Sequence, residues 1–82
     1  MLQILFVYDI IAIKKHVMKN LKQLRESKGL SQLQLALKLG LNQNTVSRYE
    51  NGQREADYQT LIMFADFFDV SVDYLIGRTD DK

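Results

Sequence analysis

The side chains in residues 43–51 that could do chemistry are amides, a hydroxyl and a guanidinium. At about 100° per residue along a helix, they fall on one side, within about 140° of one another. They are Gln43, Asn44, Ser47 and Arg48. The opposite side holds Thr45, Val46 and Tyr49. Asn and Gln pair with the N6/N7 edge of adenine, Arg pairs with the O6/N7 edge of guanine, and a helix fits the major groove. The pattern suits contact with DNA bases, and it also suits the ordinary solvated face of a surface helix.

Few residues support any other chemistry. The 82 residues contain no cysteine and one histidine, His16, so disulfides and thiol catalysis are excluded and a zinc centre has almost no ligands. There is no partnered nucleophile and no Gly-rich phosphate loop. We therefore expect no enzyme: no catalytic residue, no metal, no cofactor and no small-molecule substrate. We expect His16 to be a surface residue.

Charge is divided along the chain although the net charge is only +1. Residues 18–55 hold seven Lys and Arg against three Glu, a balance of +4, and residues 56–82 hold six Asp against Arg78 and Lys82, a balance of −4. A basic half beside an acidic half suggests one side that faces a polyanion and another that faces away. A chance distribution is the alternative.

The elements that would position these side chains are helices, because the chain has no proline and its glycines follow stretches with helical spacing of apolar residues. The predicted helices cover about residues 14–28, 32–39, 43–51, 58–68 and 72–76. Their predicted N-caps are Ser31, which forms a capping box with Gln34, and Asn42, Asp57 and Ser71. Such short helices with brief connections predict a compact all-α domain of five helices. The predicted core is Leu35, Ala36, Leu39, Leu61, Phe64, Ala65, Phe68, Val70 and Leu75.

Residues 1–17 form an N-terminal extension whose first thirteen residues are apolar and β-prone. This run is too short to span a membrane and lacks the basic leader of a signal peptide, so neither role is expected. It is either a strand or arm that packs on the domain or a partner, or a leader that precedes a true start at Met18. At the other end, residues 79–82 are expected to be a disordered tail.

The motifs of residues 18–78 together resemble the Cro/lambda-repressor-like (XRE-type) family of helix-turn-helix regulators, with a helix-turn-helix unit at about 31–51. The motifs that carry the resemblance are Leu30-Ser31-Gln32, Leu35-Ala36, Leu39-Gly40, Val46-Ser47-Arg48-Tyr49-Glu50-Asn51-Gly52 and the ending Val70-Ser71-Val72-Asp73-Tyr74-Leu75-Ile76-Gly77. The resemblance implies that the second helix of this unit enters the major groove of DNA, as the recognition helix does in this group of proteins.

The resemblance implies a role for each matching position. The residues at or near base edges would be Asn42, Gln43, Asn44, Ser47 and Arg48. The residues on the DNA backbone would be Gln32, Asn51 and Arg54. Arg25 and Glu50 would form an ion pair between the first and third helices that orients the recognition helix. The dimer contact would involve Met63, Phe67, Val72, Tyr74 and Ile76.

Three positions depart from the family pattern. Leu33 and Leu37 stand where relatives usually have polar residues, and Ala56 stands where many have proline. Leu33 and Leu37 lie one turn apart, away from the core stripe, so one hypothesis is that the apolar N-terminal arm packs over them. Ala56 would only loosen the loop before the fourth helix.

The sequence therefore predicts a cytoplasmic, sequence-specific DNA-binding transcriptional regulator, more specifically a repressor. It would bind double-stranded DNA as a homodimer on a palindromic operator. The alternative is an antitoxin-like or anti-repressor module that sequesters a partner protein, which the apolar arm and the two unusual leucines favour. The two functions are not exclusive.

Overall fold

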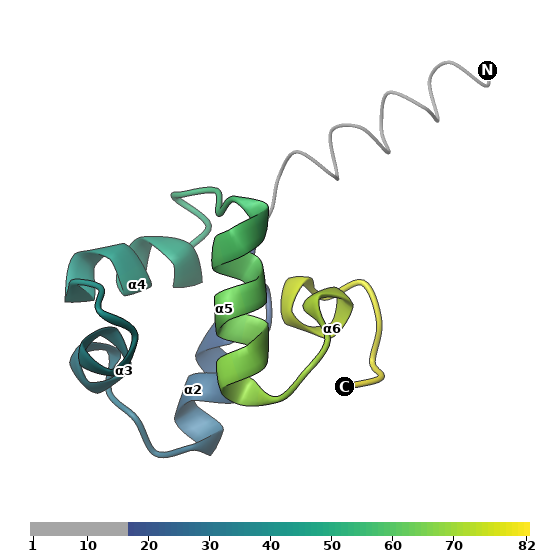
Figure 1. Cartoon of the computed structure of the whole chain (residues 1–82), viewed down its shortest axis with the longest axis horizontal. Helices are drawn as coiled ribbons and strands as arrows, with labels where there is room; N and C mark the ends of the chain where they lie inside the picture. The colour runs from purple at the N-terminus through teal and green to yellow at the C-terminus, as the bar shows by residue number, and fades with distance from the viewer. Residues whose placement is uncertain (1–16) are drawn as a thin grey trace.

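The computed structural model describes residues 17–82, and five helices form within them. They are α2 (Leu21–Ser27), α3 (Gln32–Leu39), α4 (Gln43–Glu50), α5 (Tyr58–Phe68) and α6 (Val72–Ile76). Figure 1 shows α5 in the middle, with α3 and α4 on one side and α6 on the other. No strand occurs between residues 17 and 82, and the predicted all-α fold of five helices is confirmed.

Side-chain caps set where four of the helices begin. The Ser31 hydroxyl accepts a hydrogen bond from the Gln34 backbone N–H at 3.0 Å, and the Gln34 side chain accepts one from the Ser31 N–H at 2.8 Å. Asn42, Asp57 and Ser71 each accept from the backbone N–H three residues on. Each cap satisfies a donor that the first helical turn leaves unpaired. The helices consequently begin at residues 32, 43, 58 and 72, as predicted.

Helix α5 ends differently from its neighbours. Helices α3 and α6 end at glycines with positive φ, Gly40 at 70° and Gly77 at 85°. At Gly77 a Cβ atom would lie 2.8 Å from the Lys19 Cδ, so glycine is needed there for space as well as for conformation. Helix α5 instead ends at Asp69, which adopts the left-handed conformation at φ 55° without being glycine.

The first helix begins later than predicted, at Leu21 rather than near residue 14. The start at residue 14 lies outside the described residues, but residues 17–20 are described and are not helical. They lie against the end of α6, where the Asn20 backbone N–H donates to the Leu75 carbonyl at 3.1 Å and its side chain to the Tyr74 carbonyl at 2.7 Å. Met18 is 1% exposed. Contacts with the far end of the fold therefore override the local helical pattern.

The core lies between α5 and the surrounding helices. All nine residues of the predicted core belong to it, since seven are buried and Leu39 and Val70 are half-buried against it. The other buried apolar residues are Met18, Leu21, Leu24, Val46, Tyr49, Ala56 and Tyr74. The core includes Ala56, so the residue that was predicted only to loosen the loop is a packed side chain.

The two ends of the chain bear on several predictions. His16 and almost all of the N-terminal extension lie outside the described residues, so their predicted roles stay predictions. Residues 79–82, the predicted tail, come after α6 in the chain, and Lys82 contacts two residues at the beginning of that helix. The Ser71 N–H donates to the Lys82 carbonyl at 2.8 Å, and the Lys82 ammonium lies 5.8 Å from the centre of the Tyr74 ring. Disorder of this tail in solution also stays a prediction. Between residues 17 and 82, no helix has the length and apolar content needed to cross a bilayer.

Candidate nucleic-acid interface

Helices α3 and α4 pack against each other across a short turn. Gly40 takes the left-handed conformation that ends α3, and the Leu41 N–H donates back to the Ala36 carbonyl at 2.8 Å. Asn42 is then extended, with φ −94° and ψ 161°, and caps α4. The second helix is thereby turned across the first, which is the arrangement of a helix-turn-helix unit.

The inward side of α4 fixes the helix to the core. Val46 is fully buried and Tyr49 is 4% exposed. The Tyr49 ring meets the Phe64 ring edge-on, with 5.8 Å between ring centres and 82° between their planes. An edge-to-face aromatic pair stabilises by about 0.5–1.5 kcal/mol beyond its buried area. These contacts allow α4 little freedom to rotate about its own axis.

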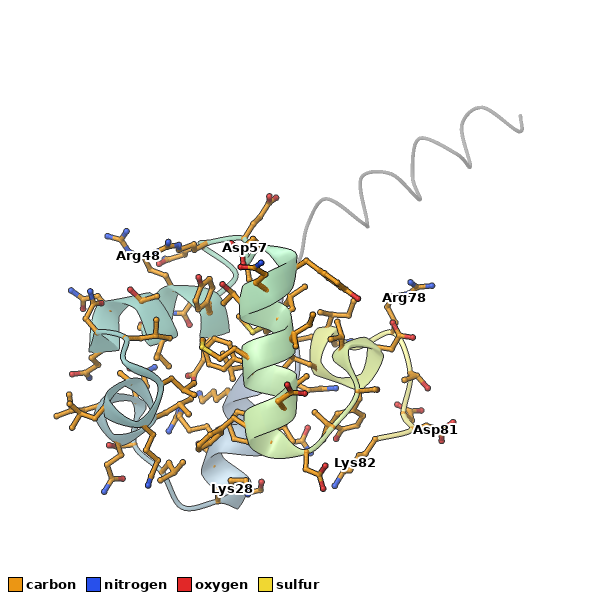
Figure 2. The ribbon with its side chains drawn as sticks, in the orientation of Figure 1. Lys28, Arg48, Asp57, Arg78, Asp81 and Lys82 are labelled. Carbon is orange, nitrogen blue, oxygen red and sulfur yellow. The ribbon has the colours of Figure 1, made fainter. Side chains whose placement is uncertain are left out.

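The outward side of α4 presents the predicted base-contacting residues to solvent. Gln43, Asn44 and Arg48 are exposed and Ser47 is half-buried. Arg48 projects from the outer side of α4, at the edge of the molecule away from α5 (Figure 2). No acidic side chain interrupts this set. The structure thus brings together four of the five predicted base-contacting residues as one exposed surface of amide, hydroxyl and guanidinium groups.

Asn42, the fifth of them, is engaged as a cap. Its Oδ1 accepts hydrogen bonds from both the backbone N–H and the hydroxyl of Thr45, each at 2.9 Å. The side chain lies at the beginning of α4, beside Gln43 and Asn44, and is exposed. Sequence reasoning missed the hydroxyl of Thr45. A threonine three residues after an asparagine N-cap is the signal that could have identified it.

The residues predicted to hold the DNA backbone surround the end of α4. Asn51 follows the helix, and its side-chain amide donates to the Ser47 hydroxyl at 3.4 Å. The Arg54 guanidinium lies 5.4 Å from the centre of the Tyr49 ring, within the range of a cation–π contact. Both side chains remain exposed. Arg54 is therefore kept near α4 while its charge stays in solvent.

The Glu50 carboxylate joins α4 to two other helices. Arg25 of α2 donates to it from Nε at 2.6 Å and from Nη2 at 3.2 Å. Gln32 of α3 donates to it from its side-chain amide at 3.0 Å. The remaining Arg25 contact is a 2.7 Å hydrogen bond to the Leu30 carbonyl. The residues predicted as an ion pair thus lie in contact, and the amide of Gln32, predicted to touch a phosphate, donates within the protein.

The charges of this network are shielded from solvent. The side chains of Arg25 and Glu50 are 11% and 2% exposed. The hydrogen bond to Glu50 raises the pKa of Arg25 above its ordinary value, while burial acts in the opposite direction. Buried charges are tolerated when they are paired and hydrogen-bonded, as here. The network holds the end of α4 at a fixed place relative to α2 and α3.

The residues predicted for a dimer contact lie on α5 and α6, and they do not form one exposed set. Met63, Phe67, Val72 and Ile76 are half-buried, and Tyr74 is 8% exposed with its ring packed into the core. Figure 2 shows Arg78, Asp81 and Lys82 beside α6, across the molecule from Arg48. The end of the chain beyond α6 and the surface of α4 therefore lie on different sides of the domain, whereas Asp57, at the start of α5, lies on the same edge as Arg48 (Figure 2).

This geometry defines a helix-turn-helix domain with an exposed recognition helix. A family model described as "Helix-turn-helix" matches residues 21–75. The chain belongs to this helix-turn-helix family, of the Cro/lambda-repressor (XRE) type, and the resemblance found in the sequence is confirmed. The family is one of DNA-binding transcription regulators and not of enzymes, as predicted.

Two of the similar chains are named as transcriptional regulators and one as an antitoxin. The chain is 45% identical over 65 residues to the HTH-type transcriptional regulator YqaE of Bacillus subtilis, covering 78% of this chain and 56% of that protein. It is 37% identical over 62 residues to the HTH-type transcriptional regulator ImmR of Bacillus subtilis, covering 76% and 49%. It is also 36% identical over 60 residues to the antitoxin PezA of Streptococcus pneumoniae, covering 73% and 38%.

The similarity is confined to part of each relative. The matched segment spans about half the length of the first two regulators and less of the antitoxin. No solved structure matches this chain.

Proposed function

We propose that this protein is a sequence-specific transcriptional repressor that reads the major groove with α4, as a homodimer on a palindromic operator. The observation that carries the proposal is the exposed, acid-free surface of α4, formed by Gln43, Asn44, Ser47 and Arg48 on a helix whose other side is buried. Amide and guanidinium groups match the hydrogen-bonding edges of adenine and guanine. The protein would act in the cytoplasm, where it would meet its operator.

The surrounding side chains supply the contacts that set register on the duplex. Asn51 and Arg54, just beyond α4, bind the DNA backbone. Gln32 does so at the start of α3 through the amide hydrogen that it does not donate to Glu50, and Asn42 lies beside the base-contacting set. Backbone contacts of this kind position a protein without specifying sequence. Affinity falls as salt is added because Lys and Arg displace the counterions of the phosphates.

The homodimer would place two recognition helices on one face of the duplex. Two half-sites one helical turn apart require the helices to lie about 34–36 Å from each other. Met63, Phe67, Val72 and Ile76 are the apolar side chains available for such a contact, because each is only half-buried in the single chain. Tyr74 would contribute mainly from beneath, since little of it reaches the surface. Repression then needs only that the dimer occupies the operator.

Selection of bound sites from a pool of random duplexes tests this proposal. The expected result is an enriched inverted repeat with half-site centres about 10 base pairs apart. Recovery of unrelated sequences, bound no more tightly than the starting pool, would refute sequence-specific binding. Enrichment of a single half-site without symmetry would agree with base reading by the recognition helix but would refute binding as a homodimer.

An antitoxin-like or anti-repressor function is the second candidate. The similarity to the antitoxin PezA favours it, as do two exposed leucines on α3, Leu33 at 49% and Leu37 at 71%. An apolar pair of this kind suits contact with a partner protein. Affinity capture from the source cells tests this function. A stoichiometric partner protein that is captured by the wild type and lost when Leu33 and Leu37 are both changed to Glu would support it. Capture that is unaffected by that change would refute the role of the two leucines in partner binding.

A further inference from the structure

Two arginines contact residues of α4, and the partners of these arginines differ in charge. Arg25 is bound by the Glu50 carboxylate at 2.6 Å and is largely buried. Arg54 is exposed, and its guanidinium carbon lies 5.4 Å from the centre of the Tyr49 ring. Between residues 17 and 82, Arg54 forms no ion pair. The charge of Arg25 is therefore neutralised inside the protein, whereas the charge of Arg54 remains available to an anion in solvent.

The loop that carries Arg54 is fixed on both sides of that residue. Gly52, at φ 70°, turns the chain back after α4, and the Gln53 N–H donates to the Arg48 carbonyl at 2.9 Å. This arrangement is typical of a helix C-terminus that ends at glycine. Ala56, two residues after Arg54, is 3% exposed. The backbone at Arg54 is thus held in place, and what is left to position is its side chain.

The Tyr49 ring lies between the core and the Arg54 side chain. It is 4% exposed and packs against Phe64 with 5.8 Å between ring centres, so the ring itself is fixed. The face of an aromatic ring attracts a guanidinium and carries no net charge. Tyr49 can therefore hold Arg54 without neutralising it. A carboxylate in the same place would hold Arg54 more strongly but would compete with any anion that approaches.

We propose that Tyr49 is a positioning residue for DNA binding, whose ring holds the Arg54 guanidinium, charged and exposed, where it meets the DNA backbone. The inference rests on the proposed function, in which Arg54 binds the backbone, and adds the residue that orients it. A guanidinium suits a phosphate because its planar donors can bind two oxygens at once. Immobilising a long side chain on binding reduces affinity, and a side chain that a ring already holds loses less.

A double-mutant cycle between Tyr49 and Arg54 separates positioning from a role in the fold. Tyr49→Leu removes the aromatic face and Tyr49→Phe keeps it, and each is combined with Arg54 and with Arg54→Ala. Val46→Ala is the matched control, because Val46 also lies on the buried side of α4 but has no ring to offer Arg54. Equilibrium binding of the intact proteins to operator and random duplexes is measured, with thermal unfolding followed by circular dichroism.

The expected result is a loss of binding that depends on Arg54. Tyr49→Leu weakens binding to operator and random duplexes about 2- to 5-fold more when Arg54 is present than when it is Ala, as for loss of an exposed cation–π contact. Tyr49→Phe binds as the wild type does. Val46→Ala weakens binding by the same factor in both backgrounds, because it acts only through the placement of α4.

The side-chain proton resonances of Arg54 test the same contact without a substitution. Protons over the face of an aromatic ring are shifted upfield, so those of Arg54 should show this shift relative to those of Arg48 in the free protein. The shift should persist when a random duplex is bound, because the ring holds the guanidinium while it contacts DNA. A shift lost on binding would show that DNA draws Arg54 away from Tyr49 and would overturn the inference.

The binding data can overturn the inference in two further ways. Equal losses for Tyr49→Leu in both Arg54 backgrounds would make Tyr49 a structural residue only, and a loss for Tyr49→Phe as large as for Tyr49→Leu would assign the effect to the hydroxyl. If Tyr49→Leu does not fold, the Arg54 resonances decide. Failure of the proposed function looks different, since operator and random duplexes would then bind equally, and the cycle on random duplexes still tests Tyr49. Absence of binding to any duplex would refute both.

Discussion

Replacing Glu50 by Gln removes the charge that α2, α3 and α4 share. The carboxylate receives Arg25 at 2.6 Å and 3.2 Å and Gln32 at 3.0 Å. The Arg25 and Glu50 side chains are 11% and 2% exposed, so the substitution leaves a guanidinium unpaired away from solvent. Breaking a buried pair costs about 3–5 kcal/mol, and the low end applies because glutamine keeps one acceptor oxygen.

A loss of about 3 kcal/mol is large for a domain of this size. An 82-residue chain has a total stability of about 4–12 kcal/mol, so the variant would retain only part of it. The expected fall in Tm is about 12–24 °C, from about 4–8 °C per kcal/mol in small domains. Urea unfolding followed by circular dichroism measures the loss. Glu55→Gln makes the same change at an exposed carboxylate and should stay within about 0.5 kcal/mol of wild type.

A double-mutant cycle then isolates the pair from the rest of the network. Arg25→Met alone leaves the Glu50 charge with Gln32 as its remaining partner, whereas Arg25→Met with Glu50→Gln leaves no buried charge. The double variant should therefore be more stable than the sum of the single losses predicts, by about 2–3 kcal/mol. Additive losses, within about 0.5 kcal/mol, would show that Arg25 and Glu50 do not act together and would refute the reasoning.

Three further predictions concern the recognition surface and the helix ends. Arg48→Ala should relax base preference and cost about 1–3 kcal/mol of operator binding. Arg54→Ala should instead weaken binding to all duplexes alike and reduce the slope of log K against log salt by about 1, and fluorescence anisotropy measures both effects. If Arg48→Ala distinguished operator from random DNA as well as the wild type does, Arg48 would not be a base-reading residue. Asp69→Gly should stabilise the fold by about 0.5–1 kcal/mol in urea unfolding, since it removes a left-handed non-glycine residue and a carboxylate from a helix C-terminus. The carboxylate of Asp57 accepts hydrogen bonds from Thr60, which lowers the pKa of Asp57 below its ordinary value. The unfolded chain therefore binds more protons than the folded one as pH falls. The stability that the Asp57 carboxylate contributes is present above about pH 4 and is lost as pH falls through the lowered pKa. Asp57→Asn should accordingly lose less Tm than wild type between pH 5 and pH 2, and an equal loss would exclude this contribution.

The starts of α3, α4, α5 and α6 could be predicted because their determinants are local. The capping box joins Ser31 to Gln34, and the caps at Asn42, Asp57 and Ser71 each reach three residues ahead. Interactions of this range are present in the sequence as short patterns. The apolar spacing of α4 likewise predicted which side would be buried, since Val46 and Tyr49 follow from helical periodicity alone.

The parts that could not be predicted depend on distant segments. Asn20 leaves the helical pattern because Tyr74 and Leu75, more than fifty residues later, offer carbonyls to it. Gln32 donates to Glu50, which only the packing of α3 on α4 brings within reach. Asn42 was predicted both as a cap and as a base contact, and only the position of the Thr45 hydroxyl shows that its oxygen is fully used.

The placement of α4 depends on three anchors, and none of them is one of the four residues Gln43, Asn44, Ser47 and Arg48 that form its exposed surface. Asn42 fixes the beginning of the helix, Val46 and Tyr49 fix its inward side, and Glu50 fixes its end. With the helix held at both ends and along its length, binding has to order only the torsions of the exposed side chains. Ordering costs about 0.5–1.5 kcal/mol for each side chain immobilised, so a helix fixed before binding loses less affinity than a mobile one. Changes to the inward and end anchors should therefore weaken operator and random duplexes together, whereas changes to the exposed surface alter which duplex is preferred.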